Sequence, residues 1–342
     1  MRRLLASPQL GLSLVILLLG GVLAIAAGSH PDPVTGRAIN NFLNSYTLIQ
    51  MATDASFFAI MAVGATVVIV AGGIDLSVGS TYALAGVAAA MVLRSMGPLD
   101  PGTAVFVGIS VSLGVGLACG IVNGLMVVGL NVHPFIITLG TMWILRGIAF
   151  VTSHAESILL PGALTSVAKA SLGLGASLYP VPMLVMLAVT VCGSIYLTRT
   201  VMGRHVFAVG GNQEASRFAG LRIHRIKIGV FAISGLTAGI AAFMGASFYG
   251  SASCADATGY ELYVIASAVV GGASLSGGRG SAVSAMLGAV LIVLIRQSIR
   301  TLHFDQNYEW IIIGCAVIIA VVLDQASARF ATRRLASMAG RS

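Results

Sequence analysis

Long apolar runs separated by short polar segments constrain this chain more than any other feature. The first extends from Leu10 to Ala27, and nine more follow at about 55–71, 80–96, 104–128, 134–153, 181–198, 228–249, 262–275, 282–302 and 310–324. Because one membrane-crossing helix needs about 20 apolar residues, most of these runs are long enough to cross. Only 9% of the residues are charged, against roughly 25% in soluble domains. The sequence predicts an all-α, polytopic membrane protein of about ten transmembrane helices, with 1–342 as a single transmembrane domain.

The first apolar run has two interpretations. It follows Met1-Arg2-Arg3 and contains Ala24-Ile25-Ala26, which resembles a signal-peptide cleavage site. The sequence favours an uncleaved first span instead, because the run is long enough to cross and many spans follow it. Several later runs are short or interrupted by glycine. They predict broken or re-entrant segments, which are tolerated at membrane depth only where they are buried in protein or line a cavity.

Charge gives the expected orientation. With the N-terminus in the cytoplasm, ten spans return the C-terminus to the same side. The outer loops then hold 8 of the 11 acids, including Asp54 and Glu309, and the inner loops hold 13 of the 19 Lys and Arg residues. This agrees with the positive-inside rule. The prediction is a multi-pass protein of the bacterial inner membrane with both termini cytoplasmic. Although the net charge is +8, the basic residues lie in loops without interleaved aromatic residues, so we expect no nucleic-acid partner.

The motifs that the sequence lacks exclude several functions. It has no GxxxxGK[ST] phosphate loop, no HExxH and no GxSxG, so we expect no catalytic residues and no ATP hydrolysis on this chain. None of its four cysteines forms a CxxC pair, so neither a zinc site nor another metal or cofactor is expected. Energy for transport would come from another subunit. A self-sufficient carrier or channel for a small polar solute remains the alternative, and a membrane enzyme or scaffold has little support.

The first notable motif, from Gly72 to Ser80, interrupts two apolar runs. In one interpretation Asp75, Ser77 and Ser80 cap the helix that restarts there. In the other, this is a broken helix whose polar groups face a translocation path, and an ionisable residue at membrane depth is functional by default. The candidate residues for the substrate path are Gly73, Asp75, Ser77, Gly79, Asn123 and Thr138.

A second motif lies in the longest cytoplasmic hydrophilic segment, 199–227, which carries six basic residues and one acid, Glu214. A short helix is expected after the Gly210-Gly211-Asn212 turn, ending at Gly220. The segment is either an orientation signal or a docking element for a cytoplasmic partner.

A third motif, from Gly271 to Ser281, is another glycine-rich break. It shares the string Gly-Gly-x-x-Leu-Ser with the first motif, which is consistent with a distant internal repeat.

Together these motifs resemble the permease family of ribose- and galactose-type ATP-binding-cassette sugar importers. The resemblance covers nearly all of the chain after about residue 38. It rests on four ordered motifs, which are 73–79, 134–140 with Arg146-Gly147, 203–204 with 210–212, and 271–274 with 277–280.

The resemblance implies a pore made by two permease chains, identical or paralogous, embedded in membrane lipid. It also implies an ATP-binding-cassette ATPase subunit on the cytoplasmic side and a periplasmic sugar-binding protein that delivers a monosaccharide. The segment 199–227 would be the coupling loop that docks on the ATPase. Its candidate residues are Gly203, Arg204, Gly210, Asn212, Glu214, Ala215 and Gly220.

Two positions depart from the family pattern. Ser216 stands where the coupling loop usually has Ala, and Arg296-Gln297 stands near the place of an Asn-Gly pair, with Arg300 close by. Arginines near an outer end run against the positive-inside pattern. Snorkelling to the outer interface is the favoured interpretation. Contact with an acidic surface of the binding protein, or with a substrate carboxylate or phosphate, is the alternative.

Overall fold

Eight helices of the computed structural model are long and apolar enough to cross a membrane, among the residues it describes. Those residues are 8–31, 36–172, 179–302, 304–312, 314–315, 318–319 and 322. The eight helices are α2 (Pro8–Ala26), α3 (Ser45–Val70), α4 (Val78–Met96), α5 (Pro101–Gly129), α6 (Pro134–Ser153), α8 (Val181–Arg199), α11 (Ile223–Tyr249) and α13 (Ala282–Thr301). They correspond to eight of the ten predicted spans, and the predicted polytopic all-α fold is confirmed.

The ninth predicted span, 262–275, is only half-length. Helix α12 (Tyr260–Val270) has 11 residues, about 16 Å at 1.5 Å per residue, against a hydrocarbon core of about 30 Å. It stops at the glycine-rich break after Val270, as a broken segment should. The tenth predicted span, 310–324, lies mostly outside the described residues.

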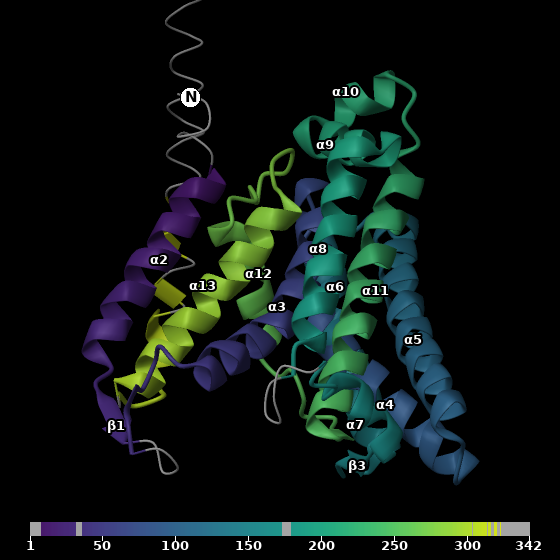
Figure 1. The fold of residues 1–342 in the computed structure, drawn as a ribbon. Helices are drawn as coiled ribbons and strands as arrows, with labels where there is room; N and C mark the ends of the chain where they lie inside the picture. Colours follow the sequence, from purple (N-terminus) through teal and green to yellow (C-terminus); the bar gives the residue numbers. More distant parts are fainter. Residues whose placement is uncertain are drawn as a thin grey trace, which may run out of the picture.

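Three shorter helices and four short strands complete the described chain. The helices are α7 (Gly162–Ala168), α9 (Val201–Gly211) and α10 (Gln213–Phe218). Strands β1 (Ser29–Pro31) and β2 (Ala38–Asn40) pair antiparallel, as do β3 (Ile158–Leu159) and β4 (Ser251–Ala252). Helices α9 and α10 lie at one end of the molecule, and β1, β3 and α7 lie at the other (Figure 1).

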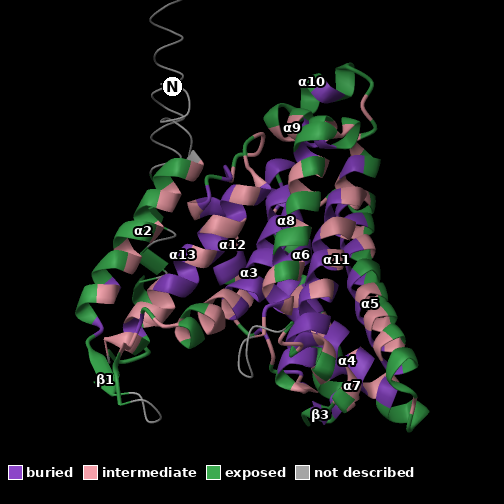
Figure 2. Cartoon of the chain, in the orientation of Figure 1, coloured by how far each residue is buried: buried purple, intermediate pink, exposed green. Residues whose placement is uncertain are grey.

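Helix α3 forms the centre of the molecule. Its apolar stretch from residue 53 onward is almost entirely buried, whereas α2 and the outer side of α5 are largely exposed (Figure 2). Exposed residues of α2 include Leu17 and Ile25, and a helix that is apolar all round fits a lipid surface. The structure therefore has a packed interior around α3 and an apolar exterior, as a membrane requires.

Helices α5 and α11 touch through glycine. A Cβ at Gly120 would overlap the Phe231 carbonyl oxygen, and one at Gly235 would overlap the Gly116 carbonyl oxygen. Small residues allow membrane helices to approach backbone to backbone. This contact accounts for part of the high glycine content.

Helix α3 begins well before the predicted start at residue 55. Asn44 caps it, accepting a hydrogen bond from the Thr47 backbone N–H at 2.8 Å. The early turns contain Gln50 and Asp54, and Asp54 was expected in an outer loop. That expectation was wrong because Asp54 has partners inside the fold, namely Gln50 and Arg300.

Candidate functional site

A buried carboxylate stands at the break between α3 and α4. Asp75 Oδ1 accepts hydrogen bonds from the Ser77 backbone N–H (2.9 Å) and from Ser77 Oγ (2.7 Å). Its Oδ2 accepts one from Ser234 Oγ of α11 at 2.7 Å, and Asn123 Nδ2 of α5 donates to Ser77 Oγ at 2.7 Å. All four residues are at most 3% exposed. A buried charge needs such partners, so this cluster ties α4, α5 and α11 together.

The other candidate path residues surround the same break. Thr138 of α6 is fully buried and donates to the Ile74 carbonyl oxygen at 3.1 Å. Gly73 packs on the Val68 side chain, and Gly79 faces α12, where a Cβ would lie 2.5 Å from Glu261 Oε2. Asp75, Ser77, Asn123 and Thr138 are thus brought together, while Gly73 and Gly79 serve as close contacts beside them.

This polar cluster is closed to solvent in the present conformation. Asn123 Oδ1 is buried and has no hydrogen-bond partner among the described residues, so one acceptor of the cluster is unsatisfied. Leaving such a group unpaired costs about 1–3 kcal/mol. The cluster is therefore polar, central and incompletely satisfied.

Neither serine caps α4 as expected. Ser77 is the N-cap residue but has helical backbone angles and makes no side-chain capping bond. Its hydroxyl donates to Asp75 instead, and Ser80 Oγ donates to the Ser77 carbonyl oxygen at 2.8 Å. The Ser77 hydroxyl is engaged elsewhere, because it donates to Asp75 and its oxygen accepts from Asn123 Nδ2.

The segment 199–227 folds into two short helices and a return to α11. Asn212 ends α9 and caps α10, accepting a hydrogen bond from the Ala215 backbone N–H at 2.9 Å. Gly220 takes a positive φ of 78° after α10, a conformation that favours glycine. The predicted short helix agrees with the structure, but the expected turn is shorter: Gly210 and Gly211 belong to the last turn of α9, and only Asn212 separates the two helices. The roles of these residues remain predictions.

The remaining candidates of this segment divide into exposed and packed residues. Arg204, Glu214 and Ala215 are exposed. Gly203 is buried, and a Cβ there would overlap the Tyr196 carbonyl oxygen where α9 turns away from α8. Phe218 was missed as a candidate, although it is 89% exposed on α10. The sequence signal that could have identified Phe218 is its position as an aromatic residue within a charged, hydrophilic segment.

The three glycine-rich motifs meet at the α9 end of the molecule. A Cβ at Gly210 would overlap the Val70 carbonyl oxygen, which accepts a hydrogen bond from the Gly278 backbone N–H at 2.9 Å. A Cβ at Gly277 would lie 2.6 Å from the Gly210 carbonyl oxygen, and one at Gly72 would lie 3.9 Å from Gly210 Cα. We call this backbone contact of 70–73, 210–211 and 277–278 the glycine junction. It joins the coupling segment directly to both helix breaks.

The two breaks share a helix-ending geometry. Gly72 (φ 81°) and Gly272 (φ 92°) each stand at the second residue past their helix, α3 or α12. The shared string instead aligns Gly72 with Gly271, one residue out of step. The two breaks are therefore alike in the backbone geometry of their turns, and the shared Gly-Gly-x-x-Leu-Ser string alone does not establish an internal repeat.

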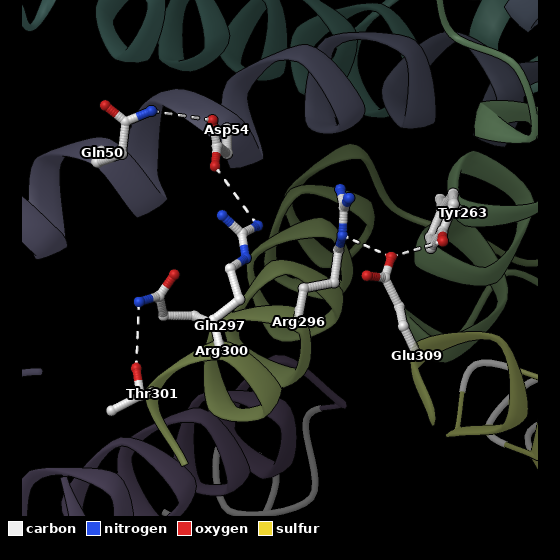
Figure 3. A network of polar contacts seen from close by, with 8 residues as sticks. All are labelled: Gln50, Asp54, Tyr263, Arg296, Gln297, Arg300, Thr301 and Glu309. Atoms are coloured by element: carbon white, nitrogen blue, oxygen red, sulfur yellow. Dashed lines mark hydrogen bonds and ion pairs between the residues drawn. The ribbon is translucent and has the colours of Figure 1, made fainter. Parts of the chain in front are cut away.

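A second polar site lies toward the end of the molecule opposite α10. It is a cavity of about 290 Å³ bordered by α3, α11, α12, α13 and the segment 306–309, which we call the distal cavity. Arg296 Nε contacts Glu309 Oε1 at 2.6 Å, and the same oxygen accepts a hydrogen bond from the Tyr263 hydroxyl at 2.6 Å (Figure 3). The Arg296 guanidinium lies over the rings of Phe58 (5.4 Å) and Tyr263 (5.2 Å).

These contacts correct the snorkelling expectation for Arg296, whose guanidinium is held against rings and a carboxylate inside the fold. Arg300 is looser, with Nη2 3.9 Å from Asp54 Oδ2 and a side chain that is 41% exposed. The acidic partners were missed because Asp54 and Glu309 were placed in loops. Their pairing joins segments far apart in the chain, which a single sequence does not reveal.

Comparison with known proteins decides the family. Residues 47–322 match the family model described as "Branched-chain amino acid transport system / permease component". The chain belongs to this permease family. It is 35% identical over 286 residues to the ribose import permease protein of Escherichia coli K12, covering 83% of this chain and 87% of that protein.

Two further relatives carry other sugars in their names. The D-allose transport system permease protein of Escherichia coli K12 is 34% identical, over 83% of this chain and 85% of its own. The L-arabinose ABC transporter permease protein of Azospirillum brasilense is 33% identical, over 92% and 87%. These likenesses confirm the predicted resemblance to sugar-importer permeases, and this chain is a multi-pass membrane permease.

Proposed function

We propose that this chain is the membrane-spanning subunit of an ATP-driven, binding-protein-dependent importer of a monosaccharide. The named substrates of its relatives include ribose, allose, arabinose and fructose, which define the sugars to test. The subunit would lie in the bacterial inner membrane with both termini cytoplasmic. It would pair with a second permease chain, identical or paralogous.

The observation that carries this proposal is the presentation of α10. This helix protrudes at one end of the molecule (Figure 1) and exposes Phe218, Glu214 and Ala215 to solvent. Exposed aromatic residues are frequent anchors at protein interfaces, and a short helix can fit a groove on a partner. With no phosphate-loop motif in the chain, the partner at α10 would be the ATPase subunit.

The glycine junction supplies a physical route from α10 to the membrane region. Helix α9 approaches the end of α3 and the 277–278 turn closely enough for backbone atoms to be in contact, and closely packed backbone has little freedom to absorb a displacement. A movement of α9 and α10 driven by the ATPase would therefore shift both helix breaks. Such coupling through a two-state element is what alternating access needs.

The Asp75 cluster would then be the gate of the path. In the proposed cycle, separation of α4, α5 and α11 exposes Asp75, Ser77 and Asn123 to the passing solute, with Thr138, Gly73 and Gly79 beside them. The unpaired Asn123 Oδ1 supports this role, because it offers an acceptor to a sugar hydroxyl. A periplasmic sugar-binding protein would deliver the solute at the end opposite α10.

Phe218→Ala tests the proposal. The tagged full-length chain, purified in mild detergent from its native cell, should bring an ATPase subunit with it. Because Phe218 is exposed, the substitution should leave the chain folded yet reduce ATPase recovery about tenfold, the loss of about 1.4 kcal/mol. Leu159→Ala is the matched control, since Leu159 is 80% exposed at the opposite end. Mass spectrometry of the eluate measures both.

Transport in vesicles completes this test. Uptake of D-ribose, D-allose, L-arabinose or D-fructose should require ATP and the co-purified subunits. Uptake by the chain alone, without ATP, would contradict the proposal and favour a self-sufficient carrier.

A further inference from the structure

We propose that the distal cavity is a binding site for a neutral monosaccharide within the permease itself. The inference takes the identity of the solute from the proposed function, and its site is separate from the Asp75 cluster and from α10.

Three charged residues of the distal cavity belong to helices that are long and apolar enough to cross a membrane. They are Asp54 of α3 and Arg296 and Arg300 of α13. Charged side chains at such positions are costly, face protein or water-filled cavities, and mark substrate pathways. The cavity, of about 290 Å³, is at the lower limit of small-molecule sites, which extend from about 300 to 1,000 Å³ for drug-sized ligands. A monosaccharide is a ligand of suitable size.

The competing explanation is that these charges only tie α3 to α13. The distance between Arg300 and Asp54 argues against it, because 3.9 Å is too long for a hydrogen bond. Arg300 also keeps 41% of its side chain exposed. A pair this loose contributes little stability, yet it leaves N–H donors and carboxylate oxygens free to meet a ligand.

Arg296 is fixed in place more firmly. Its Nε lies 2.6 Å from Glu309 Oε1 in an ion pair, and its guanidinium carbon lies over the rings of Phe58 and Tyr263. A guanidinium has five N–H donors in a rigid fork, so four remain on the terminal nitrogens. Figure 3 shows these nitrogens directed away from Glu309. An arginine held in this way loses little side-chain entropy when it binds a ligand.

The lining matches the surface of a sugar. Arg296 and Arg300 can donate hydrogen bonds, and Asp54 and Glu309 can accept them. Each hydroxyl group of a sugar both donates and accepts, so the lining offers partners for both roles. The aromatic rings of Tyr249 and Tyr260 also border the cavity and offer flat apolar faces with a polar edge. Two positive and two negative groups cancel, so the cavity has no net charge that would favour a sugar acid or a sugar phosphate.

Tryptophan fluorescence tests this site on the isolated full-length chain. The chain has two tryptophans, and Trp143→Phe leaves Trp310, which follows Glu309 and whose ring lies 6.0 Å from that of Tyr263. The Trp143→Phe variant in lipid nanodiscs is titrated with D-ribose, D-allose, L-arabinose and D-fructose, and with D-glucuronate as an acidic probe. At least one neutral sugar should give a saturable change, with no tighter binding of glucuronate.

Substitutions in the cavity locate the site. In the same background, Arg296→Lys and Glu309→Gln should weaken the Kd at least about tenfold, or about 1.4 kcal/mol. Arg300→Gln, at a loosely paired residue, should weaken it too while preserving the fold. Arg94→Lys and Glu156→Gln are the controls, because both residues are exposed outside the cavity, and neither should change the titration.

Three outcomes would overturn the inference. They are no saturable response to any neutral sugar up to about 100 mM, where a millimolar site is saturated, tighter binding of glucuronate, or equal effects of cavity and control substitutions. The titration uses neither ATP nor the ATPase, so its result is independent of the Phe218→Ala experiment. If the chain binds a sugar but recovers no ATPase, the cavity site stands and the proposed importer function is rejected. If the chain recovers the ATPase but binds no sugar, only the cavity site is rejected.

Discussion

Ser234 and Ser247 lie on the same helix, α11, and both are fully buried. Ser234 Oγ donates to the Asp75 carboxylate at 2.7 Å, whereas Ser247 Oγ has no partner among the described residues. The hydrogen bond to a charged group contributes about 1.5–3 kcal/mol. Ser234→Ala should therefore destabilise the chain by about this amount, and Ser247→Ala should be close to neutral.

Thermal unfolding of the two variants in the same detergent measures the difference. Both substitutions remove one buried oxygen from the same helix, so they share any effect of packing or helix propensity. Equal Tm values for the two would mean that the Asp75 cluster does not stabilise the fold.

At this scale the sequence predicts which polar residues lie inside the fold more reliably than how they pair. Asp75 and Ser77 lie in a break between apolar runs, Asn123 and Thr138 lie within such runs, and all four gather at one place in the fold. Ser234 was not chosen, because a serine within an apolar run is ordinary and its partner is 159 positions away. Asp54 was missed because a carboxylate near the edge of a run is usually a loop residue.

Gly210 and Gly211 at the end of α9 provide a matched pair at the scale of elements. A Cβ at Gly210 would overlap the Val70 carbonyl oxygen, whereas one at Gly211 would have no heavy atom within 4 Å. Overpacking typically costs about 1–3 kcal/mol, and backbone atoms have little room to move. Gly210→Ala should therefore destabilise the chain by about 3 kcal/mol and shift α9 away from α3. Gly211→Ala should have little effect.

Two measurements test the role of the glycine junction. Thermal unfolding gives the stability loss, and sugar uptake per ATP hydrolysed in the reconstituted complex gives the coupling. If α9 transmits the movement of the ATPase, Gly210→Ala should lower this ratio while Gly211→Ala leaves it unchanged. Equal ratios would show that the junction is only a packing contact.

Helix boundaries separate what sequence patterns can predict from what they cannot. Apolar length predicted the eight long helices, because a lipid environment requires continuous backbone hydrogen bonding within a helix. Hydropathy did not predict the early start of α3, because Gln50 and Asp54 are polar residues whose partners lie inside the fold. It also overestimated the length of α12, which ends at Val270, directly before the Gly271-Gly272 pair.

Orientation is a property of the whole molecule, and the sequence predicts it through the basic residues that gather at 199–227. Gln213 on α10 and Ser166 on α7 lie at opposite ends of the structure (Figure 1), and both are exposed. In a cysteine-free background, Ser166→Cys should react with a membrane-impermeant maleimide from outside, with the outer membrane permeabilised. Gln213→Cys should react only after the inner membrane is opened, because positive loops stay in the cytoplasm. Labelling of Gln213→Cys from outside would reverse the topology and place α10 on the wrong side for a cytoplasmic ATPase. The distal cavity would then open toward the cytoplasm, so this one measurement fixes the direction in which both proposed sites act.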